Sequence, residues 1–430
     1  MLHFLDLRAV TGDLRRVLPR PVAPELGPVE VVHDILADVE RRGDACLREL
    51  TARFDGVELD SLRVESADCF AALDRIAAPL RVALEAAHAA ITDYHQTQVH
   101  PPVDVMRDGL RLRSRSVPVD RAGCYVPGGR APLASTVLMT ASIANVAGVP
   151  DVVLCTPPDR RLGRPVDAIL AAAAIAGVDE VYSVGGAQAI GAMAFGTDSI
   201  KAVDVIVGPG NVYVSLAKRE VAAAGRVGVP SSFAGPSEVV VIADNTVPAR
   251  SAAIDVVLQA EHGPDGLAWL ISWDQAVLDA VVAEITTITQ ASPRRADIAA
   301  NFAQGGYAVL VRDAAQAIEL SNAVAPEHLE LLVADPEALL ANVRHAGAVF
   351  TGHWMPASVG DYIAGPSHVL PTFGSARFGS ALTVSDFQKH LHVVSGDEAA
   401  LRGVAPHIIA LAEAEGLPAH ADSVRFRVQL

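Results

Sequence analysis

The sequence predicts an α/β fold built on parallel β-sheets. From about residue 121 onward, short apolar runs alternate with longer segments of helical composition, which is the order of β-loop-α repeats. The apolar runs, such as Val152–Cys155 and Val239–Ile242, are continuous. Continuous apolar runs are typical of strands that helices cover on both faces of a sheet. Glycine-rich turns follow several of these runs, as expected where a strand leads into a helix.

The first third of the chain is predicted to be mainly helical. Residues 1–20 show little periodicity and are expected to form a short arm. Residues 29–54 are expected to form one amphipathic helix, because their apolar side chains recur with helical spacing. Further helix is expected over 67–94 and strands over 103–117.

The middle of the chain alternates regularly. Strands are expected at 152–155, 180–184 and 203–207, and helices at 136–147, 166–176, 187–195 and 213–223. Gly185-Gly186 and Gly208-Pro-Gly210 follow two of these strands, and ligands of parallel sheets bind beyond the carboxyl ends of strands. Glycine lets backbone amides approach a phosphate closely. The chain has no GxGxxG fingerprint here, and each glycine loop alone also fits an ordinary βα turn.

The alternation resumes after residue 239 and predicts a second α/β domain. Strands are expected at 267–272, 308–311, 329–333 and 348–350, and helices at 275–288, 314–324 and 336–346. Residues 360–372 are rich in Gly and Pro, and long irregular segments of this kind are usually functional. A helical tail is expected beyond residue 385.

Composition narrows the class of protein. A chain of 430 residues is long for a single core, so two or more domains are expected. With 34 Lys and Arg against 50 Asp and Glu, the net charge of −16 argues against nucleic acid or an anionic membrane as a partner. No signal peptide pattern and no membrane-length apolar run is seen, so a cytoplasmic protein is expected. The scattered Cys46, Cys69, Cys124 and Cys155 form no CxxC pair and suggest a reducing compartment.

The stretch from Gly235 to Gly263 could carry chemistry. A turn, Gly235-Pro-Ser-Glu, leads into a buried strand and then a helix that ends near Gln259 and His262. These two residues are three apart, so they share one face of the last helical turn and could point at one ion. Histidine is the commonest metal ligand in proteins and suits zinc, whereas glutamine is a rare metal ligand. The same spacing also fits a helix end with a histidine near the negative dipole end.

Three more pairs could be functional: Glu327 with His328, Asp361 with His368, and Glu415 with His420. The first pair could supply two adjacent bases if partly buried, and the second could supply metal ligands. Taken singly, each pair also fits an ordinary helix end, turn or polar tail.

Together these segments resemble the histidinol dehydrogenase family. The resemblance covers most of the chain, is weakest in the first hundred residues, and is specific because several long motifs occur in one order. The motifs are Gly123-Cys-Tyr-Val-Pro-Gly-Gly, Gly185-Gly-Ala-Gln-Ala-Ile-Gly-Ala-Met-Ala, Val207-Gly-Pro-Gly-Asn, Ala234-Gly-Pro-Ser-Glu-Val, Gln259-Ala-Glu-His, Ala325-Pro-Glu-His-Leu-Glu, Gly365-Pro-Ser-His-Val-Leu-Pro-Thr and Glu415-Gly-Leu-Pro-Ala-His.

The resemblance implies a particular domain organisation. The chain would form two Rossmann-like parallel-sheet domains. It would also have a short N-terminal arm and a helical, swapped C-terminal tail. The expected bounds are 1–20 for the arm, 21–113 plus 237–349 for the first domain, 114–236 plus 350–382 for the second, NAD-binding domain, and 383–430 for the tail.

The resemblance also implies an activity. Members are homodimeric enzymes that use one Zn²⁺ per subunit and NAD⁺ to oxidise L-histidinol to L-histidine through an aldehyde, in the last steps of histidine biosynthesis. The implied zinc ligands are Gln259, His262, Asp361 and His420, and the implied bases are Glu327 and His328. Ser237, His368 and Glu415 would join the ligands and His328 around the substrate. Tyr125, Gln188 and Asn211 would contact the dinucleotide, and the swapped tail would bring His420 and Glu415 to the partner subunit's site.

Some residues differ from the family pattern, and these differences leave a second choice of substrate open. Leu258 and Gly263 flank the ligand helix end where Ser and Asp are usual, yet no implied ligand or base is missing. The alternative is therefore a paralogous zinc and NAD dehydrogenase of another amino or sulfonated alcohol. Glu415 favours a cationic amino alcohol, since a carboxylate would repel a sulfonate. A zinc hydrolase would work without NAD, and a non-catalytic binding protein would not need Glu327 beside His328.

Overall fold

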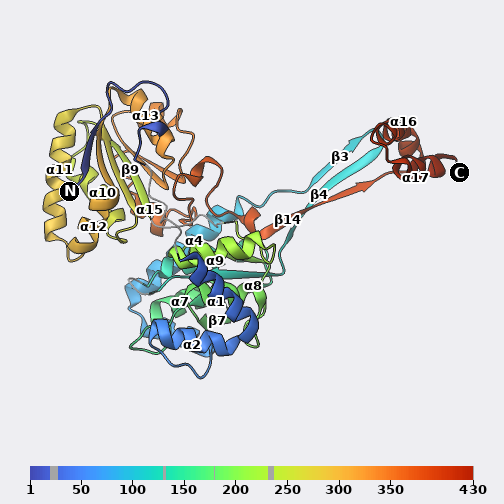
Figure 1. Ribbon diagram of the computed structural model, residues 1–430, viewed down its shortest axis with the longest axis horizontal. Helices are drawn as coiled ribbons and strands as arrows, with labels where there is room; N and C mark the ends of the chain where they lie inside the picture. The colour runs from blue at the N-terminus through green and yellow to red at the C-terminus, as the bar shows by residue number, and fades with distance from the viewer. Residues whose placement is uncertain (20–27, 129–131, 179, 231–236, 430) are drawn as a thin grey trace.

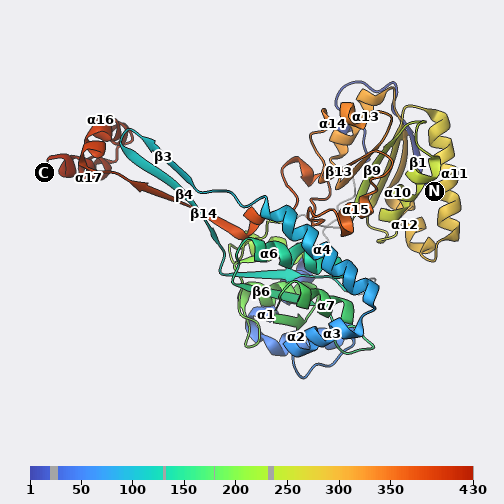
Figure 2. The ribbon, with the colours of Figure 1, turned by 180° about the vertical axis from the view of Figure 1, so that it is seen from behind.

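The computed structural model describes residues 1–19, 28–128, 132–178, 180–230 and 237–429. Two α/β lobes lie side by side, and a long arm projects from them and ends at the C-terminus (Figures 1 and 2). Within the described residues, no helix combines the length and the apolar character that crossing a membrane requires.

The first lobe contains a six-stranded sheet whose strands are all parallel. Its order is β1 (His3–Asp6), β11 (Gly306–Leu310), β10 (Leu267–Ser272), β9 (Glu238–Ala243), β12 (His328–Leu332) and β13 (Ala348–Thr351). One face is covered by α10 (Ala249–Ala260), α11 (Gln275–Ala291) and α12 (Arg295–Gly305). The other is covered by α13 (Ala314–Val324) and α14 (Pro336–Leu340) together with the N-terminal residues Leu7 and Leu14.

The second lobe contains a five-stranded sheet. Its order is β2 (Arg63–Val64), β7 (Glu180–Ser183), β6 (Asp151–Thr156), β5 (Arg121–Tyr125) and β8 (Val205–Val207), and only β2 is antiparallel. One face packs against α1 (Val29–Arg42), α2 (Asp44–Asp55), α8 (Gly186–Phe195) and α9 (Val212–Ala223). The other packs against α3 (Ser66–Arg75), α4 (Ala78–Gln96), the helical stretch α5–η2–α6 (134–146) and α7 (Asp167–Ile175). Both sheets confirm the predicted parallel α/β class.

The N-terminal helices cover a different sheet from the one expected. The expected bounds grouped 21–113 with 237–349, but α1 to α4 pack on the five-stranded sheet. Val32 and Val39 of α1 share one core with Met193 of α8, and Ala72 of α3 shares another with Ala172 of α7. Helical periodicity identifies the apolar face of a helix, but it does not identify which sheet that face covers.

Three further elements differ from the sequence prediction. The expected arm contributes an edge strand, β1, which pairs with β11. The single helix expected over 29–54 is two helices, because Gly43 between them has φ +53°. The expected helical tail begins with a strand, β14 (Gln388–Ser395), which pairs antiparallel with β4 (Leu110–Pro118). Since the partner of β14 lies far away in the chain, no local signal marks this pairing.

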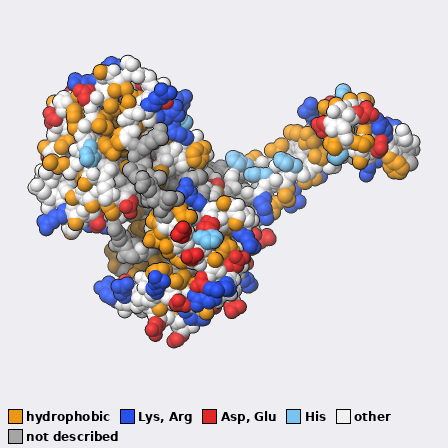
Figure 3. All heavy atoms as spheres, in the orientation of Figure 1, with side chains coloured by type: hydrophobic (Ala, Val, Ile, Leu, Met, Phe, Trp, Pro, Cys, Tyr) orange, Lys and Arg blue, Asp and Glu red, His pale blue; other side chains and the backbone are white. Residues whose placement is uncertain are grey.

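The projecting arm is a three-stranded ribbon capped by two helices. Its strands are β14, β4 and β3 (Val103–Arg107), and α16 (Glu398–Ala414) and α17 (Pro418–Gln429) form the tip (Figure 1). Hydrophobic and histidine side chains lie open along the arm in Figure 3. Its large exposed apolar residues include Val105, Met106, Leu391, Val394, Leu411 and Phe426. An exposed apolar surface of this kind usually marks a contact with another molecule.

Candidate functional site

The end of α10 and the start of β9 bring the first candidate ligands together. His262 lies just beyond α10, and its Nδ1 atom is 3.1 Å from Oε1 of Gln259 and 3.0 Å from Oγ of Ser237. Gln259 and His262 therefore share a face, as their spacing predicts. Gln259 is buried, and its Nε2 atom has no hydrogen-bond partner within the described part of the chain. Gly235 and Pro236, which open this motif, lie outside the described residues.

The two candidate bases stand at the amino end of β12, beside β9. The backbone N–H of Glu238 donates to Oε2 of Glu327 at 2.8 Å. Nδ1 of His328 lies 3.0 Å from the backbone oxygen of Glu238, so this nitrogen carries the proton and donates it to the carbonyl. Nε2 of His328 faces Oδ1 of Asp361 at 3.5 Å. Both bases are buried.

Asp361 joins this cluster from α15 (Ala357–Tyr362), which follows β13. Burial opposes the charge of this carboxyl, but the hydrogen bond and positive charge of His328, with smaller contributions from His368 and His262, lower its pKa. Burial likewise opposes the charge of His328, but Glu327 and Asp361 outweigh burial and raise the pKa of the ring well above its usual value. Glu327 and Asp361 thus favour the protonated form of the His328 ring.

His368 links the cluster to the second lobe. Its Nδ1 atom lies 2.9 Å from the backbone oxygen of Asp361, and its Nε2 atom lies 3.0 Å from Oγ1 of Thr136 on α5. Thr136 follows Pro132, which lines the cavity described below. The metal-ligand candidates and that cavity are therefore neighbours across the junction of the lobes.

The tail residues do not join the cluster of their own chain. Glu415 ends α16 and His420 lies in α17, both exposed at the tip of the arm (Figure 1). Among the described residues of one chain, no three His, Cys, Asp or Glu side chains form a group able to hold a metal ion. One chain therefore brings together Gln259, His262, Asp361, Glu327, His328, Ser237 and His368, but not Glu415 or His420.

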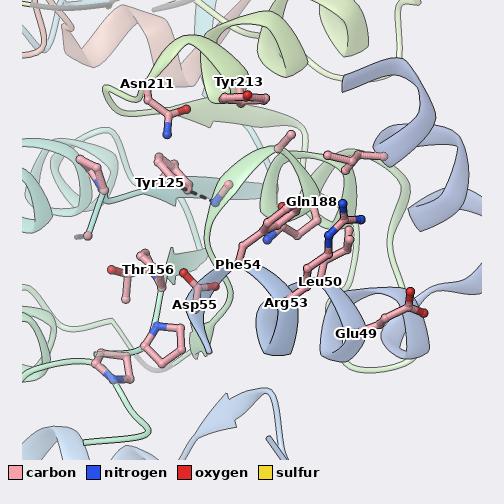
Figure 4. Close-up of a pocket in the computed structure, with 18 of the residues that line it drawn as sticks. Glu49, Leu50, Arg53, Phe54, Asp55, Tyr125, Thr156, Gln188, Asn211 and Tyr213 are labelled. Atoms are coloured by element: carbon pink, nitrogen blue, oxygen red, sulfur yellow. Dashed lines mark hydrogen bonds between the residues drawn. The ribbon is translucent and has the colours of Figure 1, made fainter. Parts of the chain in front are cut away.

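The expected dinucleotide contacts line a single cavity of about 1720 Å³ in the second lobe. Figure 4 shows Tyr125, Gln188 and Asn211 around it, beyond the carboxyl ends of the parallel strands. The hydroxyl of Tyr125 accepts a hydrogen bond of 3.1 Å from the N–H of Gly186. Gly186 has φ +69°, and a Cβ there would lie 2.6 Å from Oε1 of Gln188. The N-termini of α8 and α9 adjoin this cavity, and such termini favour phosphate.

A buried lysine supports the second glycine loop. Nζ of Lys218 donates to the backbone oxygen of Gly208 at 2.8 Å, and burial lowers the pKa of this lysine to about 7. Gly208 has φ +110°, and a Cβ there would lie 2.1 Å from the backbone oxygen of Tyr125. Oδ1 of Asn211 accepts from the N–H of Val214 and caps α9. Only glycine fits at position 208, so this loop can lie directly against the end of β5.

Sequence reasoning missed three residues of these sites. Glu238 orients both bases through its backbone, and burial, followed by the charge of Glu327, raises the pKa of its carboxyl to about 8. Glu238 belongs to the Gly235-Pro-Ser-Glu motif, and this motif is the feature of the sequence that could have identified it. Lys218 and Asp55 had no such signal. Asp55 lines the cavity with a buried Oδ2 that has no hydrogen-bond partner in the described structure, and burial raises its pKa to about 6.

The cysteines have a packing role. All four are buried, and none forms a disulfide among the described residues. Burial raises the pKa values of Cys124 and Cys155 to about 12, so both are thiols and poor nucleophiles at neutral pH.

Comparison with known proteins identifies the family. The family model described as histidinol dehydrogenase matches residues 23–428. Histidinol dehydrogenase 2 of Trichormus variabilis is 45% identical over 435 residues, which cover 100% of this chain and 99% of the relative. A histidinol dehydrogenase of a Synechococcus species is 48% identical over 401 residues, or 93% of this chain and 92% of the relative. This chain belongs to the histidinol dehydrogenase family. The crystal structure of histidinol dehydrogenase from Elizabethkingia anophelis has a TM-score of 0.94 and 33% identity, covering 100% of this chain and 98% of that one.

The donor set of this histidinol dehydrogenase family member fits a zinc ion. An amide oxygen, an imidazole nitrogen and a carboxylate are borderline-to-hard donors that Zn²⁺ accepts. Oε1 of the buried Gln259 faces Nδ1 of His262 and keeps a second lone pair, so this oxygen could also face a cation. With a proton on Nδ1 of His262, shared with Gln259 and Ser237, the Nε2 lone pair would be available to a cation.

Proposed function

We propose that this protein oxidises L-histidinol to L-histidine through L-histidinal, with one Zn²⁺ per subunit and two NAD⁺ per turnover, in the last steps of histidine biosynthesis. The observation that carries this proposal is the convergence of the ligand candidates Gln259, His262 and Asp361 on the bases Glu327 and His328. These residues lie in α10, β12 and α15 or directly beside these elements, and the names of the relatives indicate the substrate.

Gln259, His262 and Asp361 would hold the zinc ion together with His420 of the partner subunit. Bound zinc would supply a Lewis acid that anchors the imidazole and amine of the substrate. Ser237 and His368 border the same space and would contact the substrate. His368 would exchange its contact with Thr136 for a substrate atom.

His328 is placed to act as the general base. Because Nδ1 donates to the carbonyl of Glu238, the lone pair of a neutral ring would be on Nε2. If Asp361 bound a cation, less of its negative charge would act on His328. The pKa of the His328 ring would then fall, which favours the neutral ring. His328 would then take the hydroxyl proton of the alcohol as the first hydride leaves.

Glu327 would act in the second half-reaction. It would take a proton from the water that attacks the aldehyde. His328, after releasing its first proton to solvent, would take the proton of the resulting hydrate as the second hydride leaves. NAD⁺ bound against Tyr125, Gln188 and Asn211 would accept the hydrides. Since one dinucleotide accepts only one hydride, NADH must leave while the aldehyde stays bound.

The arm supports a homodimer with shared sites. It carries uncovered apolar side chains, and its tip holds Glu415 and His420 far from their own cluster. A second subunit would cover the arm and receive these two residues, so that the carboxylate of Glu415 could bind the cationic amine. The four cysteines, which form no disulfide in the described structure, support a reducing, cytoplasmic location.

The proposal is tested by NADH absorbance with purified protein, Zn²⁺, NAD⁺ and L-histidinol. Two NADH per histidinol consumed are expected. If histidinol gives no NADH while another amino or sulfonated alcohol does, the protein is a paralogous dehydrogenase. Turnover of a substrate without NAD⁺ would instead indicate a zinc hydrolase.

A further inference from the structure

A pair of carboxyl groups lies buried behind the candidate zinc site and has no role in the proposed reaction. Glu330 lies on β12, two residues after His328, and Asp255 lies on α10. Both are buried, and their side chains lie within hydrogen-bonding reach of each other. Two carboxyl groups can form a hydrogen bond only if one of them carries a proton.

The bonding around Glu330 supports such a proton. Its Oε1 atom accepts a hydrogen bond of 3.2 Å from the backbone N–H of Ala357. Its Oε2 atom is buried. When both groups are carboxylates, this atom has no hydrogen-bond partner in the described structure. A proton shared with Asp255 satisfies this atom. Burial, followed by the charge of Asp255, raises the pKa of Glu330 well above its usual value.

The groups that face the pair do not supply a strong counter-charge. His353 acts on Asp255 and lowers its pKa, but less than burial raises it. His328 acts on Glu330 as the smallest of the contributions. Among the described residues, no Arg or Lys is one of the groups that act most strongly on either carboxyl. The pair therefore relies on its own proton to avoid like-charge repulsion in a buried place.

This pair connects the three elements of the candidate site. Asp255 stands one helical turn before Gln259 on α10, and Ala357 stands one turn before Asp361 on α15. Glu330 and His328 point to the same side of β12, because side chains two apart in a strand share a face. The hydrogen bonds of Glu330 thus tie the helix of Gln259 to the helix of Asp361 through the strand of His328.

We propose that the proton shared by Asp255 and Glu330 positions α10 and α15 so that Gln259, His262 and Asp361 reach one metal ion. This inference rests on the proposed zinc site and deepens it. Asp255 and Glu330 are positioning residues, since neither touches the ion or the substrate. Above the pH at which the pair loses its proton, the two carboxylates repel and the helices separate.

The test compares Glu330→Gln with Glu330→Leu. Glutamine can donate to Asp255 and accept from Ala357 without a shared proton, whereas leucine can do neither. Zinc affinity, measured by chelator competition, is expected to stay within about threefold of wild type in Glu330→Gln and to fall about 10- to 100-fold in Glu330→Leu. The decline of affinity at alkaline pH is expected to be weaker in Glu330→Gln than in wild type. Asp386→Asn, which changes another carboxyl whose pKa burial raises, is the control and should leave zinc affinity unchanged.

Two readouts need no zinc and separate this inference from the proposed function. The infrared difference spectrum of metal-free wild type minus Glu330→Gln should contain the carbonyl band of a protonated carboxyl. The amide of Ala357 should exchange with solvent faster in Glu330→Leu than in Glu330→Gln. Absence of the band, equal exchange in the two variants, or wild-type zinc affinity in Glu330→Leu would overturn the inference. Wild-type protein that binds no zinc would overturn the proposed function. In that case the infrared band and the exchange rates would still test whether Asp255 and Glu330 share a proton.

Discussion

The backbone of Glu238 holds both candidate bases: its carbonyl lies 3.0 Å from Nδ1 of His328, and its N–H lies 2.8 Å from Oε2 of Glu327. This relationship follows from the parallel pairing of β9 with β12, in which His328 is aligned with Val239. The orientation of the bases is thus part of the sheet and does not depend on a mobile side chain.

Replacing His328 by Asn should remove the base and keep the bond to the carbonyl of Glu238. We expect kcat for histidinol oxidation to fall about 10²- to 10⁴-fold, the usual contribution of a general base. Zinc affinity and Tm should change little, because His328 is not a proposed ligand. Steady-state NADH formation and chelator competition check both statements, and near-normal turnover would exclude His328 as the base.

Replacing Glu327 by Gln should separate the two half-reactions. Oxidation of added L-histidinal needs an activated water, so its rate should fall about 10²-fold or more, whereas the first hydride transfer from histidinol should fall less. Single-turnover NADH formation with each substrate measures the two rates. Equal losses in both would show that Glu327 acts in the alcohol step as well.

Mixing two inactive variants tests the shared site. His262→Asn damages the ligand set of its own cluster, and His420→Asn damages the tail given to the partner. After denaturation and refolding together, half of the dimers should be mixed and each should contain one intact site, so about a quarter of wild-type activity should return. Each variant refolded alone is the control. Failure to regain activity, with mixed dimers present, would place His420 outside the partner's site.

Lys218 should make stability depend on pH. Its pKa is about 7 in the folded protein against 10.5 ordinarily, so between these values the unfolded chain binds more protons and stability rises with pH. Wild type should therefore gain at least about 1 kcal/mol relative to Lys218→Met between pH 7 and pH 10. Urea unfolding at both pH values measures this gain, with the exposed Lys201→Met as the matched control. An equal gain of wild type relative to Lys201→Met would contradict the assignment.

Gly208→Ala should damage the dinucleotide cavity. An alanine Cβ would lie 2.1 Å from the backbone oxygen of Tyr125, at φ +110°, so the loop must move away from the end of β5. We expect a loss of about 1–3 kcal/mol in unfolding free energy and at least about a tenfold loss of NAD⁺ affinity. Calorimetry and fluorescence titration measure these. Gly225→Ala, which also has a positive φ but open space around it, should lose stability and keep NAD⁺ affinity.

Much of the site was predictable because its residues are of unusual types in dense motifs. The spacing of Gln259 and His262 places them on one helix face, and the glycine loops after β7 and β8 mark the cavity. By contrast, the roles of Lys218, Asp55 and the pair of Asp255 with Glu330 become evident only from their surroundings in the folded chain. A lysine or a carboxylate in a helix is ordinarily a solvated residue, and only its packed surroundings give it another role.

The sequence by itself determined the parallel α/β class, the places of most strands and helices, and the chemical types of the candidate ligands and bases. These properties follow from hydrophobic periodicity, glycine turns and side-chain chemistry, which are local. Only the tertiary structure decided that α1 to α4 cover the five-stranded sheet, that β14 joins β3 and β4 in a projecting arm, and that Glu415 and His420 lie far from their own cluster. Each of these features depends on contacts between residues far apart in the chain, and local sequence patterns do not predict such contacts.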